Sequence, residues 1–243
     1  MSDQTSPGGP QKSTDPLVIR ELKFLGGMAA AGAWRPELTL PEVAFVGRSN
    51  VGKSSLLNKL VRRKAFARVS KTPGRTREIN FFQVNEQFVL VDLPGYGYAK
   101  IAKERKAEWK PLIQGYLHQS PMLRGIVQLL DARRDPTDDD LDMLDFLAER
   151  GVPTIVAVTK VDKFSRGAGE KAVRDLALRL NLDEDQVIAF SAVTGQGRDE
   201  LAEAVISLVE APSPNPDTDD DDAATHADGT TGGGGSEVDV PHA

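Results

Sequence analysis

A phosphate-binding motif is the clearest chemical feature of this 243-residue sequence. Residues 47–54 read GRSNVGKS after an apolar run, which matches the pattern G-x-x-x-x-G-K-[ST] between a strand and a helix. The two glycines let the backbone curl so that N–H groups face phosphate oxygens. Lys53 can reach the β- and γ-phosphates, and the Ser54 hydroxyl can bind the Mg²⁺ between them. The residues predicted to contact a nucleotide here are Gly47, Arg48, Ser49, Asn50, Val51, Gly52, Lys53 and Ser54.

A second motif, D-x-x-G, ends a later apolar run at Asp92, Leu93, Pro94 and Gly95. Asp92 is placed to hold the metal through water, and the Gly95 N–H can contact a γ-phosphate. The motif alone is a weak signal, because many strands end in an aspartate and a turn. Its position after the phosphate loop strengthens the prediction.

Two further segments that follow apolar runs predict recognition of a base. The Asp162 carboxylate can accept hydrogen bonds from the N1–H and the exocyclic amine of guanine, whereas adenine offers no such pair. Asp162 is therefore predicted to select GTP over ATP, while the Lys160 stem packs over the purine and the backbone of the second segment meets the guanine O6. For the first segment a solvated charged turn is an equal alternative. The segments are Thr159, Lys160, Val161, Asp162 and Phe190, Ser191, Ala192.

Residues 64–76 are basic and rich in turn formers, which predicts an exposed loop. A nucleotide switch needs a residue that contacts Mg²⁺ and γ-phosphate only while that phosphate is present. Thr76 is the best candidate and Thr72 is its rival. A hydroxyl that simply faces water is the alternative for Thr76.

These segments are positioned by alternating strands and helices. This alternation predicts a parallel sheet covered on both faces, with ligands at the carboxyl ends of its strands. The two strands around Asn85 and Glu86 are predicted to form an antiparallel hairpin. The expected strands are 43–46, 79–84, 88–92, 125–130, 154–158 and 187–190, and the expected helices are 53–63, 102–119, 138–150, 170–180 and 199–209.

Composition sets the outer limits of the protein. The sequence has no cysteine, which excludes disulfides and thiolate metal sites. We expect disorder in residues 1–16 and in the acidic residues 212–243, and one folded domain over 17–211. The net charge of −6 comes from those ends, so the domain itself is mildly basic. The aspartate run 219–222 is interpreted as a solubility tail, with an ion site or a nucleic-acid mimic as the alternative.

Five segments occur in this order along the chain: GRSNVGKSSLLNKL, KTPGRT, DLPGYGYAK, TKVD and FSA. Together they resemble the EngB/YihA family of bacterial GTPases, in the group with Era, EngA and TrmE. The resemblance implies a Ras-like α/β fold with a mainly parallel six-stranded sheet, one antiparallel strand and helices on both faces. It also implies hydrolysis of GTP to GDP with Mg²⁺ and a role in assembly of the large ribosomal subunit, with effects on cell division and septation. It adds Gly74, Arg75, Thr76, Arg77 and Glu78 to the nucleotide contacts and makes Ser54 and Thr76 metal ligands, beside Asp92, which holds the metal through water.

The residue after D-x-x-G bears on the mechanism. Ras-like enzymes carry a glutamine there that orients the attacking water, and this sequence has Tyr96. We therefore expect slow hydrolysis unless K⁺ or the ribosomal partner assists. K⁺ is suggested because Asn50 resembles the asparagine of K⁺-using relatives such as TrmE, although Asn50 can equally be a structural cap. The groups predicted to act in hydrolysis are Lys53, Thr76, Gly95 and Asn50.

Basic residues around both expected switch segments suggest an RNA partner whose binding depends on the nucleotide. A solvated surface is the alternative, and the aromatic residues Phe66, Tyr96, Tyr98 and Trp109 can either stack on bases or pack locally. No signal peptide or membrane span is apparent, so a cytoplasmic monomer without DNA or membrane partners is expected. Two other classes stay open: a nucleotide-gated scaffold at the division site, and a P-loop ATPase or kinase, against which Asp162 argues.

Overall fold

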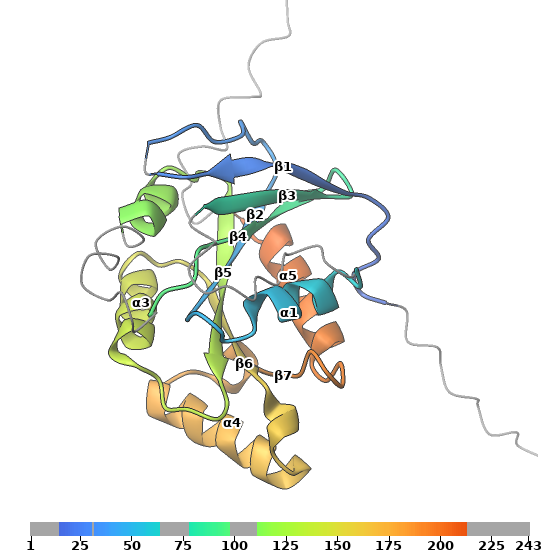
Figure 1. Cartoon of the computed structure of the whole chain (residues 1–243), viewed down its shortest axis with the longest axis vertical. Helices are drawn as coiled ribbons and strands as arrows, with labels where there is room; N and C mark the ends of the chain where they lie inside the picture. The colour runs from blue at the N-terminus through green and yellow to red at the C-terminus, as the bar shows by residue number, and fades with distance from the viewer. Residues whose placement is uncertain (1–14, 31, 64–77, 98–110, 213–243) are drawn as a thin grey trace, which may run out of the picture.

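A seven-stranded sheet forms the centre of the molecule (Figure 1). The structure is a computed structural model that describes residues 15–30, 32–63, 78–97 and 111–212. The strand order is β1-β3-β4-β2-β5-β6-β7. β3 runs antiparallel to its neighbours β1 and β4, and the other neighbouring pairs are parallel. The strands are β1 Leu22–Met28, β2 Glu42–Gly47, β3 Ile79–Val84, β4 Phe88–Asp92, β5 Leu123–Asp131, β6 Thr154–Thr159 and β7 Val187–Phe190.

This topology confirms the Ras-like α/β fold and its single antiparallel strand, but the expected strand number of six was wrong. The missed strand is β1, which pairs with β3 at the edge of the sheet. It shows no alternating pattern, because only one of its edges is paired in the described sheet and its register shifts between Phe24 and Gly26. Gly26 has φ +146°, and a Cβ there would lie 2.6 Å from the Trp34 ring, so this strand requires a glycine.

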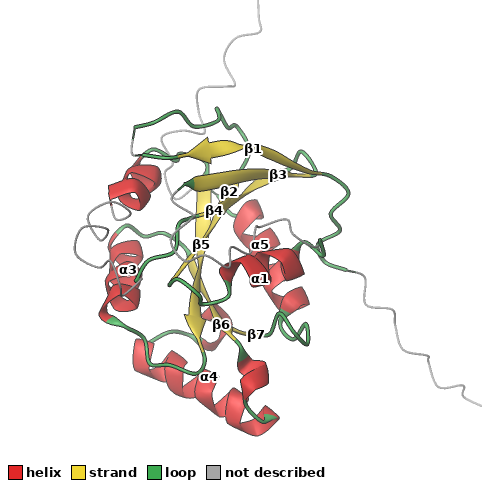
Figure 2. Ribbon diagram, in the orientation of Figure 1, coloured by secondary structure: helices red, strands yellow, loops and turns green. Residues whose placement is uncertain are grey.

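Helices cover both faces of the sheet, as predicted (Figure 2). α1 and α5 pack on the face that receives Val43 and Phe45 of β2. The helical residues 111–118 and α3 pack on the opposite face, against Ala44 and Val46. Alternate residues of β2 thus enter opposite cores, as a central strand buried on both faces requires. The helices are α1 Lys53–Leu60, α3 Asp138–Glu149, α4 Arg166–Leu180 and α5 Arg198–Glu210, with 3₁₀ turns η1 Val161–Lys163 and η2 Glu184–Gln186.

The predicted element bounds differ from the observed ones mainly at helix ends. α1 ends at Leu60 rather than at residue 63, and Arg62 beyond it has φ +51°. α4 begins at Arg166, where Gly167 and Gly169 in the first turn weaken the helical signal. Of the helix expected over 102–119, residues 111–118 are helical and 102–110 lie outside the described residues.

The described structure begins at Asp15 and ends at Pro212. Residues 1–14 and 213–243 lie outside the described residues, so the three-part division of the chain stays a prediction. Asp15, just before the expected domain boundary, pairs with Arg198 of α5, and Leu17 is buried in the core. No helix among the described residues is long and apolar enough to cross a membrane.

Candidate nucleotide-binding site

The phosphate loop joins β2 to α1 at the carboxyl edge of the sheet. Gly47 leaves no room for a side chain, because a Cβ there would lie 3.0 Å from the carbonyl oxygen of Leu129. Gly52 has φ +112°, a left-handed conformation that favours glycine. The first turn of α1 has no acidic residue and Gly52 supplies no side-chain cap, so its backbone N–H groups are suited to an anion. The local geometry therefore agrees with the predicted phosphate cradle.

The two charged groups expected around the phosphates and the metal lie in contact. Lys53 Nζ forms an ion pair with Asp92 Oδ1, and both side chains are at most 10% exposed. α1 and β4 thus bring the motif lysine and the motif aspartate into contact. Ser54 follows Lys53 in the first turn of α1 and is partly buried. A carboxylate and a hydroxyl on adjoining elements are the oxygen donors that suit Mg²⁺.

The D-x-x-G turn is fastened to the phosphate loop through the backbone. The Ser49 N–H donates to the Tyr96 carbonyl at 2.8 Å, and the Tyr96 N–H donates to the Gly47 carbonyl at 3.3 Å. Gly95 lies against the loop, since a Cβ on it would come within 3.3 Å of the Ser49 backbone nitrogen. If either segment moves, these hydrogen bonds must break or the other segment must move with it.

Tyr96 points away from the phosphate loop and into the core. Its side chain is fully buried, and its hydroxyl donates to Asp140 Oδ1 at 2.8 Å. Gln128 Nε2 donates to the Tyr96 hydroxyl at 3.3 Å and to the Asp140 carbonyl at 2.9 Å. Burial, together with the neighbouring Asp140 carboxylate, raises the pKa of Tyr96 well above its usual value, so the hydroxyl remains a donor. Of the two readings of Tyr96, local packing is confirmed and base stacking is excluded in this conformation.

The two predicted base-binding segments meet at the ends of β6 and β7. Ser191 Oγ donates to Asp162 Oδ1 at 2.7 Å and accepts from the backbone of Val193 and Thr194. The Ser191 hydrogen bond is the main reason why the pKa of Asp162 lies below its usual range. The side chain expected to read guanine is therefore ionised and held in one orientation. Phe190 and Ser191 are buried and Ala192 is partly buried beside them.

Lys160 and Thr159 connect the base segment to the phosphate loop. The Thr159 hydroxyl lies 2.7 Å from the Val51 carbonyl, and Lys160 Nζ donates to the Asn50 carbonyl at 2.7 Å. Lys160 has φ +63° and also bonds Asp131 Oδ2 at 2.8 Å. These contacts bring two motifs that are more than 100 residues apart onto one rigid edge.

Sequence reasoning missed Asp131 and Arg133. Asp131 ends β5, where it receives two side-chain hydrogen bonds from Arg133, at 2.9 and 2.8 Å, besides the one from Lys160. Partial burial opposes ionisation, but these donors hold the pKa of Asp131 well below its usual range. An aspartate one residue beyond the expected strand 125–130 was the available signal, because strand ends of a parallel sheet gather ligand-positioning groups.

Several predicted contacts lie outside the described residues: Gly74, Arg75, Thr76 and its rival Thr72, and Arg77, together with Phe66, Tyr98 and Trp109. Glu78 is exposed just before β3. Asn50 has φ +66° and an exposed side chain. Asparagine is one of the few residues that tolerates this conformation, which favours the structural reading of Asn50 and leaves the K⁺ reading a prediction.

Known proteins resemble this chain along most of its described length. Residues 42–160 match the family described as 50S ribosome-binding GTPase. A probable GTP-binding protein EngB of Gemmatimonas aurantiaca is 68% identical over 196 residues, covering 81% of this chain and 96% of that protein. The corresponding protein of Halothermothrix orenii is 49% identical, covering 72% and 89%. A crystal structure of a probable GTP-binding protein EngB superposes with a TM-score of 0.55 at 25% identity, covering 69% of this chain and 98% of that one.

These likenesses fall on the segments that the structure gathers at one edge of the sheet. The phosphate loop, the D-x-x-G turn and Asp162 all lie inside or directly beside the matched residues 42–160. The ATPase and kinase alternatives are thereby removed. The chain belongs to the EngB family of GTP-binding proteins, and it is a GTPase.

Proposed function

We propose that this GTPase is a molecular switch that acts in assembly of the large ribosomal subunit and is needed for normal cell division and septation. The family description, 50S ribosome-binding GTPase, supports the ribosomal partner. The observation that carries the switch is the pair of backbone hydrogen bonds between Tyr96 and the phosphate loop. Through them, a change at the phosphates reaches the segment that follows the D-x-x-G turn.

Nucleotide binding is proposed to rearrange the ion pair between Lys53 and Asp92. Phosphate oxygens offer the Lys53 ammonium a stronger partner than one carboxylate, and the α1 N–H groups complete their cradle. At the other end of the nucleotide, Asp162 would accept the two guanine donors while Ser191 holds it in place. The backbone of Phe190 to Ala192 would meet the guanine O6.

Mg²⁺ is proposed to be held by Ser54, Thr76 and Asp92 together with phosphate oxygens. The described residues contain no group of three His, Asp or Glu side chains that could hold a metal ion alone. That fits Mg²⁺, which is usually bound through one or two carboxylates and the phosphates of its substrate. When bound, the ion would neutralise charge on the transferred phosphoryl group.

Hydrolysis is proposed to be slow in the isolated protein. Gly95, Lys53 and Thr76 would stabilise the γ-phosphate, but Tyr96 is buried and cannot orient the attacking water as a glutamine does. K⁺ bound near Asn50 is one proposed assistant. Single-turnover hydrolysis with K⁺ replaced by Na⁺ tests it, and equal rates would remove the ion from the mechanism.

The partner is proposed to be the large-subunit precursor or its RNA, bound by a monomer in the cytoplasm, where ribosomal subunits are assembled. The mildly basic domain suits RNA, because phosphates attract Lys and Arg without regard to sequence. Co-sedimentation with large ribosomal subunits in GDP and in a non-hydrolysable GTP analogue tests this. We expect salt-sensitive binding that favours the GTP analogue; binding that ignores both salt and nucleotide would contradict the proposal.

The burial of Tyr96 also supports a second candidate, a nucleotide-gated scaffold at the division site in which turnover is incidental. The two candidates differ in what the partner does to hydrolysis. Turnover that ribosomal subunits leave unchanged would favour the scaffold.

A further inference from the structure

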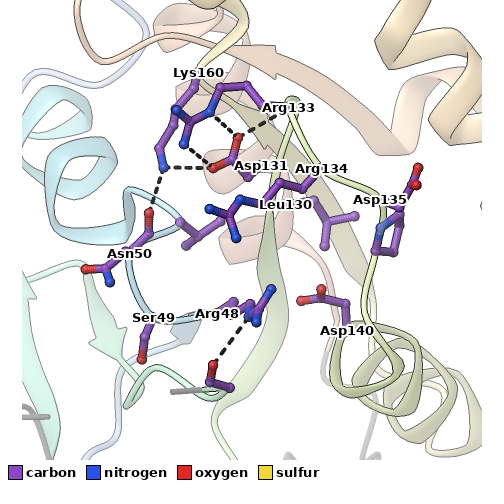
Figure 3. Close-up of a pocket in the computed structure, with 13 residues that line it drawn as sticks. Arg48, Ser49, Asn50, Leu130, Asp131, Arg133, Arg134, Asp135, Asp140 and Lys160 are labelled. Atoms are coloured by element: carbon purple, nitrogen blue, oxygen red, sulfur yellow. Dashed lines mark hydrogen bonds and ion pairs between the residues drawn. The ribbon is translucent and has the colours of Figure 1, made fainter. Parts of the chain in front are cut away.

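A pocket of about 320 Å³ lies beside the phosphate loop (Figure 3). One wall is residues 48–51 of the loop with Gly97, and the other is the segment from Leu130 to Pro136 that leads from β5 to α3. Neither Lys53, Ser54 nor Asp92 lines it. The pocket thus shares residues 48–51 with the predicted nucleotide contacts, but it lies outside the cluster of Lys53, Ser54 and Asp92 proposed for the phosphates and Mg²⁺.

The acidic groups of this pocket are engaged with other side chains. Asp131 bonds Lys160 and Arg133. Asp135 pairs with Arg179 at 2.6 Å, and Asp140 accepts from Tyr96 and Thr137. The carboxylates in the pocket walls are thus already bonded to other residues of the protein, which leaves them poorly placed to bind a cationic ligand.

Two arginines of the pocket remain available. Arg48 and Arg134 make no ion pair with an acid anywhere in the described ranges, and both side chains project into the space between the walls (Figure 3). Arg48 has only a long hydrogen bond, 3.4 Å, from Nε to the Gly97 carbonyl, and Arg134 is exposed. Two guanidinium groups that converge on a concave site, beside acids that are already bonded, give a local excess of positive charge.

We propose that this pocket binds a backbone phosphate of the RNA partner through Arg48 and Arg134. The guanidinium fork matches the oxygens of a phosphate, and its charge persists at all physiological pH values. The volume lies at the lower end of ligand sites, which suits a phosphate with its adjoining sugar. The RNA identity of the ligand rests on the proposed function, whereas the phosphate chemistry rests on the pocket itself.

The position of Arg48 gives such a contact a consequence. Arg48 belongs to the phosphate loop, and its present acceptor, the Gly97 carbonyl, lies two residues after Gly95. A phosphate that draws the Arg48 guanidinium away would compete with that carbonyl. RNA docking would then act on the same backbone segment that places the Gly95 N–H, which offers a route from partner binding to hydrolysis.

The test uses the full chain loaded with a non-hydrolysable GTP analogue and Mg²⁺, so that the nucleotide site is filled. A fluorescent single-stranded oligouridylate reports binding through its anisotropy. Arg134→Gln removes one guanidinium without touching the nucleotide site. Arg174→Gln, at an exposed arginine of α4, is the matched control. Inorganic phosphate, added as a competitor, is the second arm and reports whether a free phosphate occupies the site.

We expect Arg134→Gln to weaken oligouridylate binding at least threefold and to reduce the slope of log K against log salt by about 0.7, the value for one phosphate contact on a single strand. Arg174→Gln should leave both unchanged. Binding that Arg134→Gln does not alter, or wild-type protein that fails to bind, overturns the proposal. Millimolar inorganic phosphate that displaces the oligouridylate from the wild type, but not from Arg134→Gln, would show that a free phosphate also occupies the site.

The outcome separates this inference from the proposed function. If wild-type protein and Arg134→Gln co-sediment equally with ribosomal subunits and bind the oligomer equally, the ribosomal function stands and the phosphate site fails. If oligouridylate binding depends on Arg134 but neither the wild type nor the variant binds ribosomal subunits, the phosphate site stands and the ribosomal function fails.

Discussion

At the scale of single residues, base specificity is proposed to depend on Asp162. Asp162→Asn should weaken GTP binding about tenfold to a hundredfold, because a charged hydrogen bond contributes about 1.5–3 kcal/mol. The new amide can donate to a base that carries a carbonyl at C2, so binding of xanthosine triphosphate should improve. Competition against a fluorescent GDP analogue measures both effects. Asp175→Asn, in an exposed pair on α4, is the control; unchanged selectivity in Asp162→Asn would contradict the assignment.

Tyr96 is expected to act as an anchor rather than as a reactant. Tyr96→Phe removes one hydroxyl and leaves the buried Asp140 and Gln128 without that partner. The free energy of unfolding should fall by about 1–3 kcal/mol, the cost of an unsatisfied buried group. Urea unfolding of this variant, of Asp140→Asn and of the double variant measures the coupling. Additive effects of the two substitutions would show that the hydrogen bond contributes nothing.

Asp131 links stability to pH. Its pKa is lower in the folded than in the unfolded chain, so its carboxylate stabilises the fold above the unfolded value of about 4, and this contribution is lost as pH falls toward the folded pKa. Asp131→Asn should therefore lower the free energy of unfolding at pH 7. The difference between wild type and variant should disappear in acid. It should also weaken GTP binding, because Lys160 loses a partner. A stability difference that is independent of pH between 7 and 3 would contradict this reading.

At the scale of elements, Arg198 joins α1, α5 and the chain before β1. Its buried guanidinium donates to the carbonyl of Leu60 at 2.8 Å and to that of Leu17 at 3.0 Å, and it pairs with Asp15. Arg198→Lys keeps the charge but cannot reach these acceptors as a planar fork. We expect a loss of about 3 kcal/mol in urea unfolding, comparable to breaking a buried pair. Arg174→Lys on α4 is the control, and an equal effect of both variants would show that Arg198 is not special.

The sequence predicted elements whose signal is local. The phosphate loop was found because two glycines, a lysine and a serine have fixed spacing, and β2 because a strand buried on both faces is a continuous apolar run. β1 was missed because its two glycines and uneven exposure give no period. Three specific contacts could not be predicted for a different reason. The Lys160 partner of Asp131, the Leu60 partner of Arg198 and the Asp140 partner of Tyr96 lie 29, 138 and 44 residues away, and only the folded sheet brings them together.

At the scale of the whole molecule, one edge of the sheet holds both ends of the proposed nucleotide site. Lys160 and Thr159 fix the base end to the phosphate loop, and Tyr96 fixes the D-x-x-G turn to the same loop and to α3. Among the described residues, Tyr96 occupies the position of a water-orienting glutamine and is buried. We therefore propose that a partner or an ion orients the attacking water.

Single-turnover GTP hydrolysis, measured with and without purified large ribosomal subunits at one salt concentration, tests whether the partner accelerates hydrolysis. We expect a slow rate from the protein alone and at least a tenfold faster rate with the subunits, equal to about 1.4 kcal/mol of additional transition-state stabilisation. Fast hydrolysis by the protein alone, or an unchanged rate with subunits, would show that the partner does not supply the missing assistance.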